Sequence, residues 1–145
     1  MASSLRQQAL IEAPIEEVWE LLSDPSRFPE WSYPTIEVTG VPTQVEKGST
    51  FRNTSRGPLG MKNTTIFEVA ELDELREIKL RCQTSGYYSH WVLTEARGDT
   101  FAELEYGVEP QGLQQRAIGA TITKGAIRRY VDQSLDGIRR LLTRE

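Results

Sequence analysis

Residues 11–25 read IEAPIEEVWELLSDP, and this stretch decides how the fold begins. Pro14 suits the first turn of a helix, and Glu16 and Glu17 complement the positive end of a helix dipole. The apolar residues that follow recur at helical spacing, at Ile15, Val18, Trp19 and Leu22. The stretch therefore predicts a short helix with one apolar face.

The residues on either side extend this pattern. Residues 5–12 read as a strand that runs directly into the predicted helix. Asp24 and Pro25 provide a new N-cap and first turn, which predicts a second short helix that ends near Trp31. The chain therefore begins with one strand and two short helices.

The middle of the chain changes from helical to alternating periodicity. A strand begins at Ile36 and Val38, and further strands are predicted over residues 50–55, 61–72, 77–84, 87–95 and 100–108. The separators are short and rich in turn residues, as at Ser85-Gly86. Short separators predict antiparallel hairpins.

The last part of the chain is predicted to be one long helix, from Leu113 to the end. Its clearest apolar stripe consists of Ile127, Val131, Leu135, Ile138 and Leu142. Gly119, Gly125 and Gly137 are unfavourable in a helix interior. Either Gly119 and Gly125 bend the helix or leave room for a ligand, or the helix proper begins near Ala126.

Composition limits the function further. The chain has 145 residues, a size that suits one domain over residues 1–145. The net charge of −4 argues against a nucleic-acid partner. The single cysteine, Cys82, fits a reducing compartment, and no signal peptide or membrane span is recognisable, so we expect a cytoplasmic monomer or homodimer.

The order of elements resembles the helix-grip fold of the SRPBCC superfamily, which includes the Bet v 1-like and START-like proteins. Residues 11–25 are similar to the opening strand and helix of that family, and Pro29-Glu30-Trp31 continues the similarity. Residues 91–95 and 100–104 resemble its penultimate hairpin. The resemblance is to the polyketide cyclase/dehydrase branch. It implies an α+β fold in which a curved antiparallel sheet of about seven strands wraps around a long C-terminal helix and leaves a cavity.

Alternation along the strands indicates which side chains face that cavity. The inward set is largely apolar, with neutral hydrogen-bonding groups among it, as in small-molecule pockets. The predicted ligand contacts are Trp31, Tyr33, Phe51, Asn53, Leu59, Thr65, Phe67, Leu80, Trp91, Leu104, Ile118 and Ile122. The alternative is that the apolar members fill a solid core. The polar members favour a wet cavity, because unpaired buried polar groups cost about 1–3 kcal/mol each.

The family resemblance implies a small hydrophobic or aromatic ligand and a cofactor-free cyclase or dehydratase reaction on a polyketide-like substrate. Family cyclases use tyrosine, serine, asparagine and arginine, which makes Tyr87, Tyr106, Ser89 and Asn63 the candidate catalytic residues. No arginine falls at an inward position. A non-catalytic carrier, chaperone or sequestering protein for a lipid, quinone or natural product is the alternative, and a partner-binding module is the third.

His90 is the only histidine, and alternation places it on the outer face, beside Trp91. A shift of one residue in register would instead bring His90 and Tyr88 into the cavity as acid or base. With one histidine and one cysteine, the sequence has no zinc-type ligand cluster, so no metal is expected.

Overall fold

Seven strands form one antiparallel sheet with the spatial order β1-β7-β6-β5-β4-β3-β2. The computed structural model describes residues 4–32, 35–56, 60–109, 112–113 and 124–142. The strands are β1 (Ser4–Ile11), β2 (Thr35–Thr39), β3 (Thr50–Arg56), β4 (Lys62–Asp73), β5 (Glu77–Cys82), β6 (Tyr87–Ala96) and β7 (Asp99–Val108). The predicted strands are therefore confirmed within a few residues. The clearest difference is β5, which ends at Cys82 because a turn begins at the next residue.

Helices α1 (Ile15–Ser23) and α2 (Phe28–Trp31), with the intervening 3-10 turn η1 (Pro25–Arg27), are the predicted helical pair. Val18, Trp19, Leu21 and Leu22 form the buried face of α1. The Asp24 carboxylate accepts a hydrogen bond from the Ser26 backbone N–H at 3.1 Å, which confirms its capping role.

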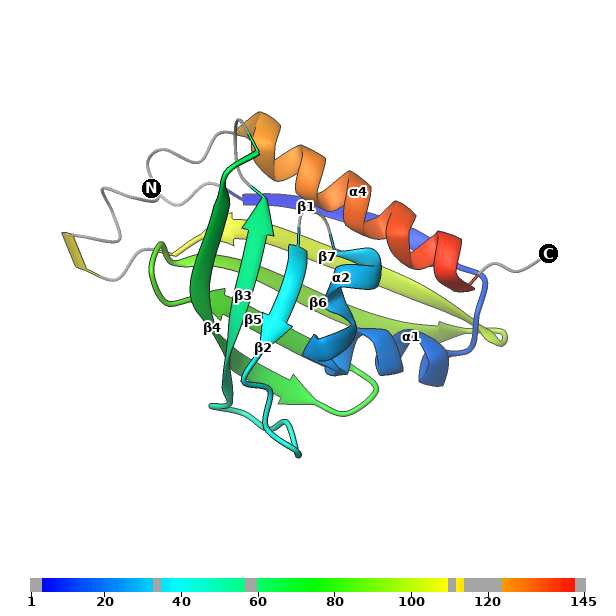
Figure 1. The fold of residues 1–145 in the computed structure, drawn as a ribbon. Coiled ribbons are helices and arrows are strands. Elements are labelled where there is room, and N and C mark those ends of the chain that lie inside the picture. The colour runs from blue at the N-terminus through cyan, green and yellow to red at the C-terminus, as the bar shows by residue number, and fades with distance from the viewer. Residues whose placement is uncertain (1–3, 33–34, 57–59, 110–111, 114–123, 143–145) are drawn as a thin grey trace.

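Helix α4 (Lys124–Leu142) lies across one face of the sheet, with α1 and α2 against it (Figure 1). The predicted apolar stripe of α4 is confirmed, because Ile127, Val131, Leu135 and Ile138 are all buried. The expected helical stretch upstream of Lys124 falls mainly on residues 114–123, which lie outside the described residues.

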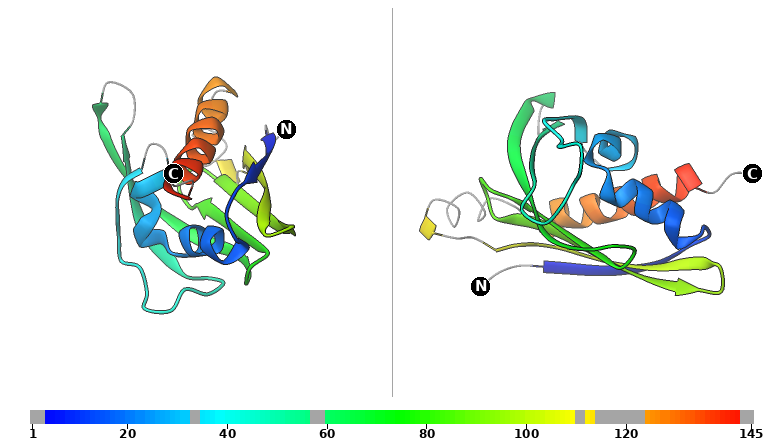
Figure 2. Two further views of the ribbon diagram at one scale, coloured as in Figure 1. Left: turned by 90° about the vertical axis from the view of Figure 1, so that its right-hand side faces the viewer. Right: turned by 90° about the horizontal axis from the view of Figure 1, so that it is seen from below.

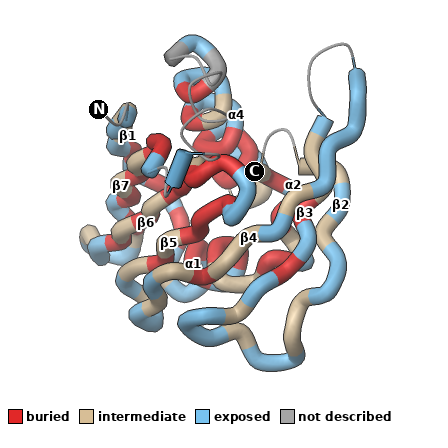
Figure 3. Tube along the Cα trace, turned by 90° about the vertical axis from the view of Figure 1, so that its left-hand side faces the viewer, coloured by how far each residue is buried: buried red, intermediate tan, exposed pale blue. Residues whose placement is uncertain are grey.

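The sheet curves around these helices, so that its concave face surrounds α4 (Figure 2). Buried residues gather between the sheet and the helices, while the β2–β3 connection and the β3–β4 hairpin are largely exposed (Figure 3). Register shifts between Thr35 and Glu37 and between Val69 and Glu71 interrupt the pairing of β2 and β4. These irregularities coincide with the strongly bent side of the sheet.

Strand pairing aligns residues in rows across the concave face. One row runs from Phe51 through Phe67 to Cys82. The next row runs through Val69, Leu80, Ser89, Tyr106 and Leu5. These rows place apolar side chains on the bent side of the sheet and hydroxyl groups nearer β7, opposite α4.

Helices α2 and α4 approach each other at Gly137. A Cβ atom added there would overlap the carbonyl oxygen of Trp31 and would lie 2.9 Å from its Cα. Backbone atoms cannot rotate away as a side chain can, so only glycine fits this contact. Gly137 thus holds α4 in place along the sheet, rather than bending the helix.

Candidate functional site

Four hydroxyl-bearing side chains meet between α4 and the concave face of the sheet. Tyr87 on β6, Tyr106 on β7 and Tyr130 on α4 have ring centroids 5.3–5.8 Å apart. Ser134 follows Tyr130 by one helical turn and is fully buried. We call Tyr87, Tyr106, Tyr130 and Ser134 the hydroxyl cluster.

Two groups of this cluster are buried without a hydrogen-bond partner. Tyr87 Oη and Ser134 Oγ are inaccessible to solvent, and neither makes a hydrogen bond of acceptable geometry. Both hydroxyls still lie close enough to Tyr106 to influence its pKa. Leaving such a group unsatisfied costs about 1–3 kcal/mol, so a pair of them in one place points to a missing partner.

Burial keeps the phenols of the cluster protonated. Removal from solvent raises the pKa of Tyr87 well above its ordinary value, and the neighbouring Tyr106 and Tyr130 raise it further. Burial also raises the pKa of Tyr106, and the nearby Ser134 and Tyr87 hydroxyls partly offset this rise. At neutral pH these side chains are therefore hydrogen-bond donors and not bases.

The ionisation of tyrosine provides a test of this environment. The pKa of Tyr88 on the opposite face is also raised, by burial and by Glu105, so three of the five tyrosines resist ionisation. Because their pKa values are raised on folding, their contribution to stability is complete below about pH 10 and is lost above it. Absorbance at 295 nm should show at most two tyrosines ionising near pH 10 in the native protein, and all five in denaturant. Ionisation of three or more near pH 10 before unfolding would contradict this expectation.

Apolar residues from neighbouring strands form the walls beside the cluster. Phe51 and Phe67 stack with ring centroids 6.0 Å apart. Leu80, Trp91 and Leu104 are almost fully buried and belong to the hydrophobic core. The structure thus places these predicted contacts on the concave face, and their contact with a ligand stays a prediction.

Trp31, one of the predicted ligand contacts, lies in the core. Its ring packs edge-on against Trp91 at 5.6 Å, and its Nε1 donates to the Leu21 carbonyl at 3.2 Å. Four other predicted contacts, Tyr33, Leu59, Ile118 and Ile122, lie outside the described residues.

A polar chain occupies the concave side of β3. Thr35 Oγ1 donates to Asn53 Oδ1 at 3.4 Å, and Asn53 Nδ2 donates to Ser55 Oγ at 2.9 Å. Asn53 is buried and already paired in this way, and Thr65 lies opposite it on β4. These residues form a second polar area, separate from the hydroxyl cluster.

The candidate catalytic residues do not all come together. Ser89 pairs with Tyr106 across β6 and β7, so both lie in the same row as Leu80. Asn63 is exposed and lies four residues beyond Phe67 on β4, about 13 Å along the strand. The structure therefore groups Tyr87, Ser89 and Tyr106 and leaves Asn63 apart, because the β3–β4 hairpin extends beyond its neighbours.

Tyr130 and Ser134 are cluster members that the sequence analysis missed. Their signal was present, since both lie among the apolar stripe residues Ile127, Val131 and Leu135 at spacings of three and four. Polar residues on the buried face of a helix therefore indicate a polar site as well as polar residues at inward strand positions do.

The outer face of the sheet carries a separate ionic network. His90 Nε2 lies 2.6 Å from Glu77 Oε2, and the Tyr88 hydroxyl donates to Glu105 at 3.1 Å. Lys79 lies over the Tyr88 ring and pairs with Glu109 at 2.9 Å. The expected outward placement of His90 is confirmed, and the alternative register with Tyr88 in the cavity is wrong.

The described residues contain no group of three or more histidine, cysteine, aspartate or glutamate side chains placed to hold a metal ion. Among the same residues, no helix is long and apolar enough to cross a membrane.

Comparison with solved structures agrees on the fold. Protein CV1439 from Chromobacterium violaceum matches with a TM-score of 0.77 and 16% identity, covering 99% of both chains. The Zhui aromatase/cyclase from Streptomyces sp. R1128 matches with a TM-score of 0.71 and 16% identity, covering 98% of this chain and 94% of that one. An AHSA1-like protein from Aeromonas hydrophila matches with a TM-score of 0.69 and 16% identity, covering 95% and 90%. At these identities the likeness shows the fold alone.

Comparison with protein families is more informative about ancestry. No curated protein sequence gives a significant match. One family model, described as polyketide cyclase / dehydrase and lipid transport, matches residues 3–143. Since that match spans nearly the whole chain, the protein belongs to the polyketide cyclase/dehydrase and lipid transport family.

Proposed function

We propose that the protein binds a small, mostly apolar molecule between α4 and the concave face of the sheet. The ligand would carry an oxygen that accepts hydrogen bonds from the hydroxyl cluster. The observation that carries this proposal is the pair of buried hydroxyls, Tyr87 Oη and Ser134 Oγ, that lack partners. A ligand carbonyl beside them would recover a hydrogen-bonding cost of about 1–3 kcal/mol per group.

The proposed reaction is cofactor-free enolisation, ring closure or water loss on a polyketide-like substrate. The family description and the aromatase/cyclase neighbour support this class of chemistry. The Tyr87 and Tyr106 hydroxyls would donate to the oxygen on which negative charge develops as the enolate forms. Enolisation moves a proton, ring closure forms a carbon–carbon bond as the enolate adds to a second carbonyl, and dehydration expels water. None of these steps is a net oxidation or reduction, so the proposal requires no redox cofactor.

A carrier function is the second candidate, and one observation favours it. The only histidine is paired with Glu77 on the outer face, so it is not available as a base at the hydroxyl cluster. Neutral hydroxyls and apolar walls suffice to hold a lipid, quinone or natural product without changing it.

Ligand location is tested by NMR with a defined probe, 2-acetylnaphthalene, an aromatic ketone. We expect saturable shifts in the amide signals of β6, β7 and α4 near Tyr87, Tyr106 and Ser134. The convex-face residues around His90 and Glu77 serve as the internal control and should not respond. Saturable shifts confined to that outer face, or no saturable shift at all, would refute the proposed site.

A further inference from the structure

A pocket distinct from the hydroxyl cluster, which we call the second pocket, lies at the end of the molecule away from the start of α4. It has a volume of about 490 Å³ and forms where three segments meet: the end of α1, the β2–β3 connection and the β4–β5 turn (Figure 1). Its lining consists of Trp19, Ser23, Asp24, Val41, Pro42, Thr43, Gln44, Val45, Leu72 and Glu74. The volume suits a small organic ligand, since such pockets measure about 300–1,000 Å³.

Apolar side chains form the inner wall of this pocket. Trp19 is 9% exposed and belongs to the core cluster, so its indole connects the core to the pocket. Val41, Val45 and Leu72 are partly buried and pack against the same core. Together they offer a hydrophobic and aromatic surface to the body of a ligand.

Two carboxylates at the rim give the pocket its charge. Asp24 uses Oδ1 to bind the Ser26 N–H and hydroxyl, which leaves Oδ2 available. Within the described part of the chain, neither Asp24 nor Glu74 belongs to an ion pair. Among the described residues, neither carboxylate beside the aromatic wall therefore has an ion-pair partner, although Arg27 and Asp24 attract each other through space.

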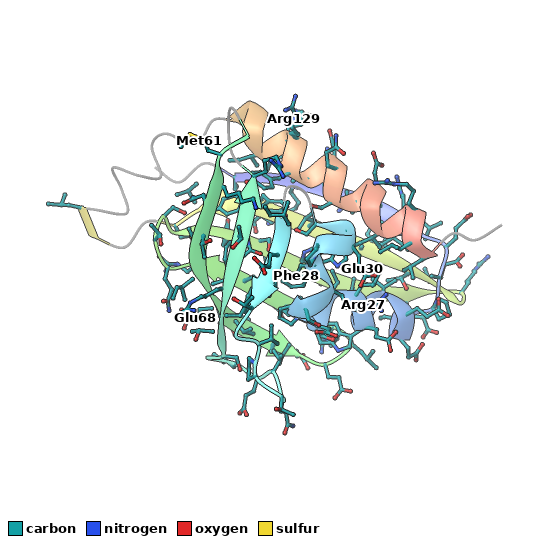
Figure 4. The ribbon with its side chains drawn as sticks, viewed as in Figure 1. Arg27, Phe28, Glu30, Met61, Glu68 and Arg129 are labelled. Carbon is teal, nitrogen blue, oxygen red and sulfur yellow. The ribbon has the colours of Figure 1, made fainter. Side chains whose placement is uncertain are left out.

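Basic side chains on the segments that adjoin the pocket are paired with other carboxylates. Arg27 lies 3.0 Å from Glu30 and 3.7 Å from Glu20. Arg27 ends η1 and Glu30 belongs to α2, and the two side chains lie close together (Figure 4). Arg76 pairs with Asp73 at 3.8 Å, and Lys47 pairs with Glu71 at 3.5 Å. None of these basic residues lines the pocket.

We propose that this second pocket binds a small organic ammonium ion with an apolar body. The ammonium group would lie between the Asp24 and Glu74 carboxylates, and the apolar body would pack against Trp19. An aromatic face attracts a cation in addition to burying its apolar carbon atoms. This site is independent of the hydroxyl cluster, and neither proposal depends on the other.

The test uses 2-phenylethylammonium as the probe and 2-phenylethanol as its neutral counterpart. In NMR spectra of the three tryptophan indole N–H groups, the ammonium ion should shift the Trp19 signal saturably and leave Trp31 and Trp91 unchanged. Replacing the ammonium by the hydroxyl should weaken binding severalfold. A higher salt concentration should weaken the binding of the ammonium ion but not that of 2-phenylethanol, because salt screens carboxylates that are accessible to solvent.

Substitutions that replace a carboxylate by an amide test which residues bind the ammonium group. Asp24→Asn keeps the capping oxygen and Glu74→Gln keeps the side-chain length, and each should weaken binding about two- to fivefold. Glu71→Gln removes the same charge from a neighbouring residue outside the lining and should have little effect. The proposal is overturned if 2-phenylethanol binds as tightly as the ammonium ion, if Trp31 or Trp91 responds in place of Trp19, if all three variants behave alike, or if no indole signal moves.

Discussion

Gly137→Ala should destabilise the protein by about 2–3 kcal/mol, although the same change stabilises most exposed helix positions. The new Cβ atom would overlap the Trp31 carbonyl oxygen, so α4 must move away from α2. Trp31 itself is held by its hydrogen bond to Leu21 and its contact with Trp91, which prevents an easy adjustment on that side. Urea unfolding, followed by circular dichroism, measures the loss.

Gly125→Ala is the matched control within the same helix. Gly125 lies in the first turn of α4 and is exposed, so alanine there should be neutral or should stabilise the protein by up to about 1 kcal/mol. The changes in the free energy of unfolding caused by Gly137→Ala and Gly125→Ala should therefore have opposite signs. Equal effects would show that α4 does not depend on close contact with Trp31.

Tyr87→Phe and Tyr106→Phe should each weaken ligand binding about two- to tenfold, because each removes one donor worth about 0.5–1.5 kcal/mol. If the protein is an enzyme, turnover should fall further, on the order of a hundredfold, since charge gathers on the ligand oxygen in the transition state. The size of the effect thus separates a catalyst from a carrier. Binding titrations and initial rates with the same ligand supply both numbers.

Tyr88→Phe is the matched control for this experiment. It removes the same hydroxyl from the neighbouring residue, whose side chain contacts Lys79 and Glu105 on the outer face. Binding should be unaffected, as it should be for His90→Ala. Loss of function in these two variants with neutral Tyr87→Phe and Tyr106→Phe would show that the ligand binds on the other face.

The ligand-free stability of Tyr87→Phe adds a sharper expectation. Because Tyr87 Oη has no partner, its removal should leave the free protein equally stable or more stable, by about 1 kcal/mol. If the Tyr87→Phe substitution weakens binding but does not lower stability, the Tyr87 hydroxyl has a functional rather than a structural role.

The sequence was sufficient to predict the elements, because their signals are local. The helical spacing of Val18 and Leu22 and the capping carboxylate of Asp24 lie within a few residues of the structure they specify. The alternation on β6 also predicted correctly that Ser89 and Trp91 share a face and that His90 lies on the other.

What could not be predicted depends on distances between elements. Nothing local shows that Tyr130 on α4 meets Tyr87 and Tyr106, since this requires the position of α4 along the sheet. Asn63 is exposed although alternation assigns it to the inner face, because alternation reports a face but not where a strand leaves the sheet. The second pocket was missed because residues 41–45 form a connection without periodicity.

The proposed function requires the hydroxyl cluster to donate a hydrogen bond to a ligand oxygen. Its most direct test compares the affinities of 2-acetylnaphthalene and 2-ethylnaphthalene for the unmodified protein and for Tyr106→Phe. The ketone should lose two- to tenfold in affinity on substitution, and the hydrocarbon, which has no acceptor, should lose nothing. Equal losses for the two probes, or no loss for the ketone, would contradict the claim.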